Sequence, residues 1–225
     1  MEAGKVYHIY NRGNNKQNIF FEDENYSFFL KRFDKYLAAK MDVLAYCLMP
    51  NHFHLLVRIK IIDGISDNGI AIAVAKAFRN FLISYTKAIN KKYDRTGVLF
   101  QPKYKRAEVD NDFYFSWLIQ YVHMNPVIAG LCKNPEDWKY SSYTAILGDK
   151  ATKISVKEVR EWFGGVAEFI RIHNERVIDK GQCRNCDLMI EMHTVCVLQT
   201  TVVWQAQPSG TSKTTVVFIR DPKSS

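Results

Sequence analysis

Hydrophobic positions along the first 60 residues follow two different periods. Residues 5–11 (KVYHIYN) are rich in aromatic and β-branched side chains and precede the turn sequence RGNN, so they are predicted to form a strand. From Asp23 onward the apolar residues recur at helical spacing, at Tyr26, Phe29, Leu30, Phe33 and Leu37. Residues 41–49 and 52–60 are predicted strands, and the short connection Pro50-Asn51 between them predicts a β-hairpin.

The same succession of elements returns after residue 60. Helical spacing runs over residues 70–89, and residues 101–109 (QPKYKRAEV) are predicted to form a fourth strand. Asn111 or Asp112 can cap a third helix, which should end at Asn125-Pro126 because the residue before proline is disfavoured in the helical region. The order strand–helix–strand–strand–helix–strand predicts an α+β, ferredoxin-like (split βαβ) antiparallel sheet with helices packed on it. That fold carries no function by itself.

The C-terminal third changes in character along its length. We interpret residues 1–145 as the main domain and residues 146–180 as a helical extension with short helices around Gly164-Gly165. Residues 181–225 are rich in Thr, Val, Ser and Gln and are interpreted as a tail that is a candidate for poor order. The tail contains a possible zinc pattern, which we attribute to coincidence because its two halves are unusually close together: Cys183, Cys186, His193 and Cys196.

Composition narrows the function classes. The chain of 225 residues is 47% hydrophobic, which is typical of a globular protein with one good core. Its formal charge of +8 favours a polyanionic partner, most simply nucleic acid. The start of the chain has no apolar signal core and no segment is long enough for a membrane span, so no membrane partner is expected. The five scattered cysteines favour a reducing, cytoplasmic location.

Two histidines interrupt the third predicted strand. Side chains two residues apart on a strand share a face, so His52 and His54 point together while Phe53, Leu55 and Val57 point into a core. Two imidazoles on one face are good ligands for a divalent metal. An isolated H-x-H is weak evidence, because most such pairs bind nothing.

The third predicted helix can bring further chemistry to that face. Tyr121 and Asn125 are one helical turn apart, beside the apolar side formed by Phe115, Leu118, Ile119 and Val122. A helix packed over the histidines would place a phenol and an amide oxygen at the same spot. From spacing alone we favour the alternative, in which Tyr121 is a half-buried packing residue and Asn125 belongs to the helix end.

Basic residues gather between residues 76 and 106 with aromatic residues among them. Positive charge follows a phosphate backbone and aromatic rings stack on unpaired bases, so this stretch suits single-stranded nucleic acid. The alternative is a solvated helix face, which its one-sided charge disfavours. With two residues of the first turn added, the candidate DNA-binding set is Arg12, Asn14, Lys76, Arg79, Lys87, Lys91, Lys92, Arg95, Lys103, Tyr104, Lys105 and Arg106.

Four stretches together resemble a known family. They are YHIYNRGNNKQNIFFEDENY, AYCLMPNHFHLLV, GVLFQPKYKR and YVHMNPVIAGLCKNPEDWKYSSY, which run in order between residues 5 and 143. The chain resembles the REP-associated tyrosine transposases, a branch of the IS200-like (transposase-17) superfamily of single-tyrosine HUH transposases. The combination of MPNHFH with Y-x-H-x-NP downstream is specific, whereas each piece alone is not. Residues after about 180 match nothing in that family.

The resemblance implies a role for each matching residue. The histidines of the HUH motif fall on His52 and His54, the nucleophilic tyrosine falls on Tyr121, and the polar residue that completes or approaches the metal site falls on Asn125. Many relatives carry glutamine or another ligand there, so Asn125 departs from the pattern. His123 lies two residues from Tyr121 on a helix and therefore points away from it, which suits a packing role.

The implied activity is metal-dependent cleavage and strand transfer of single-stranded DNA. Mg²⁺ or Mn²⁺ would polarise the scissile phosphate, and the tyrosine would form a 5′-phosphotyrosine intermediate at hairpin-forming repeats. In this branch a monomer is favoured, although some relatives are dimers. The alternative function is a non-catalytic or domesticated nucleic-acid-binding module on the same fold. A plasmid replication or conjugation nuclease is less favoured, because those proteins carry further domains.

Overall fold

The structure, a computed structural model, describes residues 1–175. The predicted tail of residues 181–225 lies outside the described residues, and so does its cysteine and histidine pattern. The chain divides into two units, Met1–Ile170 and Arg171–Ser225. The first unit holds the sheet and the helices that position the candidate site. In the second, Arg171 pairs with Glu175.

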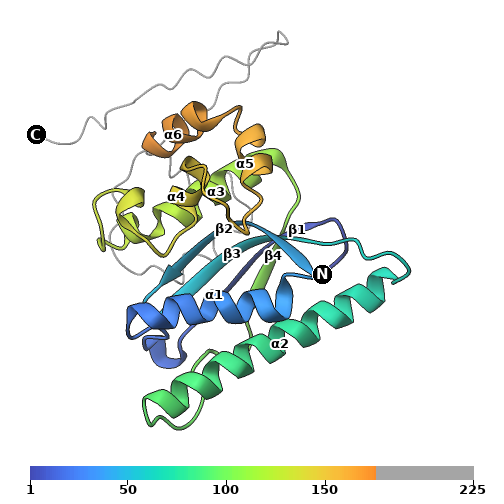
Figure 1. Ribbon diagram of the computed structural model, residues 1–225, viewed down its shortest axis with the longest axis vertical. Helices are drawn as coiled ribbons and strands as arrows, with labels where there is room; N and C mark the ends of the chain where they lie inside the picture. The colour runs from blue at the N-terminus through green and yellow to red at the C-terminus, as the bar shows by residue number, and fades with distance from the viewer. Residues whose placement is uncertain (176–225) are drawn as a thin grey trace, which may run out of the picture. The chain divides into compact units, whose positions relative to one another are not determined.

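A four-stranded antiparallel sheet forms the centre of the first unit (Figure 1). Its strands are β1 (Val6–Arg12), β2 (Met41–Met49), β3 (His52–Ile59) and β4 (Lys105–Val109). The spatial order β2-β3-β1-β4, with one helix between β1 and β2 and another between β3 and β4, is the split βαβ arrangement. The predicted α+β, ferredoxin-like fold is confirmed.

Two helices cover one face of the sheet. They are α1 (Asp23–Leu37) and α2 (Asp67–Lys92), and they lie together on one side of the strands in Figure 1. Their apolar positions pack against alternate residues of the strands, so this face, which we call the apolar face, holds the main hydrophobic core. From the strands it includes Tyr7, Ile9, Leu48, Phe53, Leu55 and Val57.

The opposite face is covered by helices from the later part of the chain. These are α3 (Asp112–Ile128), α4 (Tyr143–Leu147) and α5 (Val156–Trp162), which lie on the other side of the sheet in Figure 1. A further helix, α6, spans Val166–Asn174, and two 3-10 turns, η1 and η2, span Asn14–Lys16 and Pro135–Asp137.

The segment before α4 closes the β2 edge of the sheet. The backbone N–H of Leu48 donates to the carbonyl of Tyr140 at 2.9 Å, and the N–H of Ser142 donates to the carbonyl of Tyr46 at 2.9 Å. The indole of Trp138 donates to the carbonyl of Leu48 at 3.0 Å. These bonds occupy β2 groups that an open edge would leave available to another chain.

Helix α3 is longer than predicted. Asn111 caps its start, as predicted, by accepting a hydrogen bond from the N–H of Tyr114 at 2.8 Å. Its end was wrongly predicted, because the helix passes through Pro126 and continues to Ile128. Proline removes only one N–H from the last turn, and the carbonyl of Asn125 still accepts from Ala129 at 2.9 Å.

Strand β4 is shorter than predicted. It begins at Lys105, and residues 101–104 are not part of it. They follow the loop after β1 instead, since the N–H of Gln101 donates to the carbonyl of Arg12 at 2.8 Å and Phe100 bridges Gly13. Pro102 has no N–H to give to a strand ladder, which explains the later start.

The loop after β1 is tied to the hairpin turn between β2 and β3. The carbonyl of Pro50 accepts from the N–H groups of Ile19 and Phe20 at 2.8 and 3.0 Å, and the carbonyl of Asn51 accepts from Gly13 at 2.8 Å. A Cβ on Gly13 would lie 2.0 Å from the carbonyl oxygen of Gln17, so only glycine fits there. Loop and turn are therefore one packed unit next to His52.

None of the helices described between residues 1 and 175 is both long and apolar enough to cross a membrane.

Candidate active site

The register of the sheet places the two histidines of β3 on the face opposite the main core. His52 pairs with Arg12 of β1 and Met49 of β2, and His54 pairs with Tyr10 of β1 and Cys47 of β2. Directly opposed residues of antiparallel strands share a face. We call this the histidine face. Both histidines are buried, at 3% and 0% exposure, because α3 packs over them.

Each histidine is held through its Nδ1 atom. The Nδ1 of His52 lies 2.6 Å from the side-chain oxygen of Asn51, and the Nδ1 of His54 lies 2.9 Å from the Nε2 of His8. An amide oxygen can only accept, so Nδ1 of His52 is the donor in this contact. The two β3 rings lie 5.1 Å apart between centroids with their planes at 87°.

Helix α3 brings Tyr121 to this face. The helix is anchored by Phe115, Leu118, Ile119 and Val122, all of which are buried as the helical pattern predicts. Its register turns the ring of Tyr121 edge-on to His54, with 5.6 Å between centroids and 86° between planes. On the other side the Tyr121 ring stacks on Trp117, at 5.2 Å and 8°. The phenol is therefore fixed between an indole and an imidazole.

Asn125 lies one turn further along α3 and is also buried. Its amide nitrogen donates to the carbonyl oxygen of Tyr121 at 2.9 Å, which holds the side chain beside the tyrosine. Burial raises the pKa of the Tyr121 hydroxyl well above its ordinary range, and the hydrogen bond with the Asn125 side chain lowers it in part. Tyr121 is thus protonated in this structure at neutral pH.

The donor set fits a divalent cation only with help from other groups. No cluster of three or more His, Cys, Asp or Glu side chains suited to a metal occurs among residues 1–175. Protein ligation would therefore come from the two imidazoles and the amide of Asn125, with water or substrate oxygens completing the shell. Few protein ligands and several waters or phosphate oxygens are typical of Mg²⁺ sites.

The predicted DNA-binding residues do not share one surface. Arg12 lies opposite His52, and Lys105 lies opposite Tyr10, so both are on the histidine face. Arg106 lies opposite Ile9 and therefore belongs to the apolar face, where Tyr104 also packs against Phe78 of α2 at 4.5 Å. The loop residue Asn14 lies in η1, and its N–H donates to the carbonyl of Leu99 at 2.9 Å.

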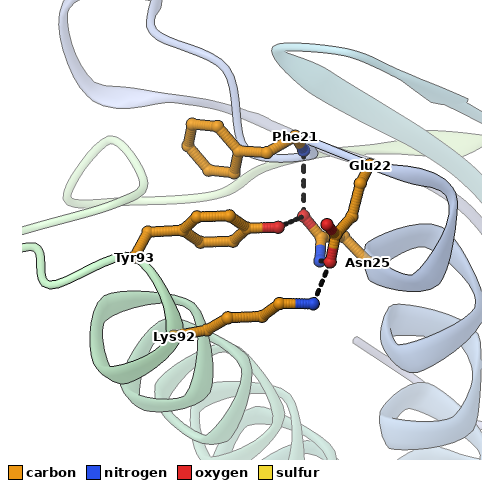
Figure 2. Close-up of polar contacts among 5 residues, drawn as sticks. All are labelled: Phe21, Glu22, Asn25, Lys92 and Tyr93. Carbon is orange, nitrogen blue, oxygen red and sulfur yellow. Dashed lines mark hydrogen bonds and ion pairs between the residues drawn. The ribbon is translucent and has the colours of Figure 1, made fainter.

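The basic residues of α2 lie on the side of the sheet away from the histidines. All five candidates on this helix are exposed: Lys76, Arg79, Lys87, Lys91 and Lys92. Lys92 is paired with Glu22 at the start of α1, where Asn25 also accepts hydrogen bonds from Phe21 N–H at 2.9 Å and Tyr93 Oη at 3.1 Å (Figure 2). This cluster joins the beginning of α1 to the end of α2.

The other two basic candidates lie near that junction or before β4. Arg95 donates to the side-chain oxygen of Gln17 at 3.1 Å and lies over the ring of Phe21. Lys103 is exposed in the segment that precedes β4. The sequence therefore gathered residues that the fold distributes over two faces and a loop.

Sequence reasoning missed two buried contacts of the histidine face. His8 of β1 bonds to His54, and burial lowers the pKa of His8 to about 3, so His8 is neutral. Ser142 accepts from the N–H of Tyr46 at 2.8 Å, and its hydroxyl lies 2.7 Å from the Nε2 of His123. His123 thus joins α3 to the segment along β2, which agrees with its predicted packing role.

Comparison with known proteins gives the family of the chain. Residues 4–125 match the family described as Transposase IS200 like. A Haemophilus influenzae protein, named provisionally as a REP-associated tyrosine transposase, is 28% identical over 106 residues. That match covers 45% of this chain and 58% of the relative, so the chain is matched to little more than half of the relative's length.

A solved structure has the same fold. It is titled as a REP-associated tyrosine transposase bound to a REP hairpin, and it superposes with a TM-score of 0.50 at 15% sequence identity. The superposition covers 69% of this chain and 92% of the other. Because the family match extends over more than half of the 225 residues, from the first strand through Asn125, this chain belongs to the IS200-like transposase family.

Proposed function

We propose that the protein cleaves single-stranded DNA and transfers the strand, with Tyr121 as the nucleophile. The observation that carries the proposal is the contact between Tyr121 of α3 and His54 of β3, two residues 67 positions apart that meet edge to face at 5.6 Å. Pure DNA binding requires neither a buried phenol nor a pair of buried imidazoles beside it. The solved relative bound to a REP hairpin supports a hairpin-containing DNA as the substrate.

The residues would divide the chemistry between them. His52, His54 and the amide oxygen of Asn125 would hold Mg²⁺ or Mn²⁺, which supplies charge stabilisation at the scissile phosphate when bound. The oxygen of Tyr121 attacks phosphorus, the bond from phosphorus to the 3′ oxygen breaks, and the phenolic proton is transferred to that leaving oxygen. The products are a 5′-phosphotyrosine and a free 3′-OH. A second 3′-OH reverses these steps and joins the strand elsewhere.

Because the pKa of Tyr121 is high, the reaction requires a group that favours loss of the phenolic proton. The hydroxyl is protonated while it is buried beside His54 and Trp117, so positive charge must arrive before it can attack. Arg12 lies opposite His52 in the sheet, and we expect it to contact a phosphate close to the site. Substrate and cation would thus activate the nucleophile together.

Formation of a covalent adduct tests the proposal. Hairpin-bearing single-stranded DNA is incubated with the protein and Mn²⁺ or Mg²⁺, and the products are separated under denaturing conditions. We expect a protein–DNA adduct that carries the 5′ end of the cleaved strand and is lost in Tyr121→Phe. Tyr114→Phe, a buried tyrosine two turns earlier on α3, is the matched control and should retain the adduct.

Two outcomes would contradict the proposal in different ways. An adduct that persists in Tyr121→Phe would show that another group is the nucleophile. Binding of several candidate hairpins without any adduct would favour the alternative, a nucleic-acid-binding module. Loss of the adduct in His54→Ala, with the hairpin still bound, would support the proposed metal role.

We also propose that one chain completes its own site, which favours a monomer. Tyr121 lies against His54 of the same chain, so no second copy is needed to supply the tyrosine helix. A complementation experiment tests this: Tyr121→Phe and His54→Ala variants are mixed and assayed for adduct. A monomer should give none, whereas restored adduct formation would show that α3 is exchanged between two copies.

A further inference from the structure

His8 is a buried polar residue for which the proposed reaction gives no role. It lies on β1, fully buried, and points to the histidine face because it is opposite Leu56 in the register. Its Nε2 lies 2.9 Å from the Nδ1 of His54, and the two ring planes differ by only 11°. The pair is diagonal across the strands, since the residue directly opposite His54 is Tyr10.

The environment of His8 fixes the ring of His54 from two directions. The hydrogen bond holds the ring at its Nδ1 edge, and Tyr10 stacks on both imidazoles, with centroids 4.7 Å from His8 and 5.9 Å from His54. A ring held at one edge and on one side has a defined orientation. Tyr121 then contacts the same ring at 86°, so the orientation of His54 also sets its relation to the nucleophile.

Two imidazoles that meet nitrogen to nitrogen at 2.9 Å have one proton between these two atoms. Either His8 donates from Nε2, which leaves the proton of His54 on its own Nε2, or His54 donates from Nδ1, which leaves a lone pair on its Nε2. Only the second arrangement allows His54 to bind a cation through Nε2. The proton of His8 then lies on its Nδ1.

The Nδ1 atom of His8 indicates that the residue does more than pack in the core. It is buried and has no hydrogen-bond partner among the residues that the structure describes. A buried polar atom without a partner destabilises a fold, so an apolar side chain would fill this position at lower cost in stability. The presence of an imidazole here is explained if its other nitrogen is needed by His54.

We propose that His8 is a positioning residue that accepts a hydrogen bond from Nδ1–H of His54 and so presents the Nε2 lone pair of His54 to a divalent cation. The inference rests on the metal role in the proposed function. Metal-binding histidines commonly donate their second N–H to an oxygen acceptor, and here the acceptor is a neutral imidazole. A neutral acceptor leaves more of the cation's positive charge available to the phosphate than a carboxylate would.

The wild-type protein provides the first test. Nitrogen-15 NMR of the full chain, labelled at histidine and loaded with Mg²⁺, reports which ring nitrogen of His8 and His54 carries a proton. We expect the proton on Nδ1 of both residues. A proton on Nε2 of His8 in the Mg²⁺-loaded protein would overturn the inference, whatever the effect of any substitution.

Variants provide the second test, with Mn²⁺ affinity measured by calorimetry. His8→Phe keeps an aromatic ring at this position but removes the nitrogen acceptor. We expect about 10- to 100-fold weaker Mn²⁺ binding. His8→Gln restores an acceptor near the position of Nε2 and should recover most of the affinity. Leu56→Val, directly opposite His8, alters the packing of the same region and should leave Mn²⁺ affinity unchanged.

The outcomes separate this inference from the function on which it rests. If wild-type protein binds Mn²⁺ without perturbing the resonances of His52 and His54, the proposed metal role fails and the inference fails with it. If Mn²⁺ binds at these histidines but His8→Phe, folded by circular dichroism, binds it as tightly as wild type, only the role of His8 is overturned. Equal weakening in His8→Phe and Leu56→Val would also overturn it, since packing alone would then explain the effect.

Discussion

The two faces of β3 are built by alternate residues of one strand, yet they differ in what they require from their neighbours. On the apolar face Phe53 touches Phe29 and Phe100, and any well-packed apolar set would serve. On the histidine face His52 and His54 are each oriented by a hydrogen bond to a specific partner. Stability is concentrated on the first face, and geometry is specified on the second.

The largest expected effect is a difference in stability between substitutions at two adjacent positions of β3, Phe53 and His52. Phe53→Ala should destabilise the protein by about 3–5 kcal/mol, because a fully buried aromatic ring is lost from the core. His52→Ala removes the hydrogen bond to Asn51 together with a smaller buried ring, so it should cost less, about 1–3 kcal/mol, while abolishing adduct formation. Denaturant unfolding measures the loss of stability in each variant, and the adduct assay measures the loss of activity. A larger loss of stability in His52→Ala would break the comparison.

A smaller effect is expected where the cover of the histidine face is attached. Ser142→Ala removes the hydroxyl that accepts from the N–H of Tyr46 and contacts the imidazole of His123, at a cost of about 1–3 kcal/mol. Ser155→Ala is a suitable control, because its side chain makes no cap hydrogen bond at the start of α5. Thermal unfolding of both variants tests the prediction, and equal stabilities would show that this attachment is dispensable.

Alkaline pH should lower the free energy of unfolding through buried tyrosines on both faces. In this respect the two faces are expected to behave alike. Burial raises the pKa of Tyr114, on α3, and of Tyr46, whose side chain packs against the main core, to about 12 in each case. In the unfolded chain a tyrosine titrates near about 10. Between these values the unfolded state binds fewer protons, so stability falls as pH rises, by up to about 1.4 kcal/mol per unit for each tyrosine.

Single Tyr→Phe variants at these two positions should each flatten that fall. Denaturant unfolding at several values between pH 10 and 12 measures the slope against wild type. If only one variant flattens it, the two buried phenols are not equivalent, and the burial of the other must be lost before it titrates.

The smallest effect concerns DNA. Lys105→Ala, on the histidine face, should lower the salt dependence of single-stranded DNA binding by about 0.7 in log–log slope, as expected for one lost phosphate contact. Lys87→Ala, exposed on α2 behind the sheet, should leave the slope unchanged. The reverse result would place the DNA path along α2 and support the larger set of basic residues predicted from the sequence.

The sequence predicted the secondary-structure elements and the face on which each side chain lies. It predicted less well which residues of different elements meet in the fold. The alternation in NHFHLLV separates His54 from Leu55, and helical spacing places Tyr121 beside Asn125, so the composition of the candidate site was accessible from local periods. His8 was not, because a single histidine in an aromatic strand resembles a core residue until the register with β3 is known. Lys87 and Lys105 were grouped by closeness in sequence, although Lys87 lies on the helix that covers the apolar face and Lys105 belongs to the histidine face.

The helix end shows the same limit on a smaller scale. A rule for isolated dipeptides ends α3 at Asn125, but the side chain of Asn125 bonds back to Tyr121 and its carbonyl accepts from Ala129. Contacts made within the folded helix outweigh the local preference against helix before Pro126.

The double hydrogen bond at the carbonyl of Pro50 also bears on attempts to retarget the protein. Three backbone hydrogen bonds join the loop over residues 13–20 to the turn that precedes His52, through the N–H groups of Gly13, Ile19 and Phe20. The side-chain amide of Asn51 adds a fourth hydrogen bond by donating to the carbonyl of Lys16 at 3.2 Å. A loop transplanted from a relative would therefore arrive with its own register and displace His52. Exchanging loop and turn together, as one cassette, is the graft that leaves the histidines in place.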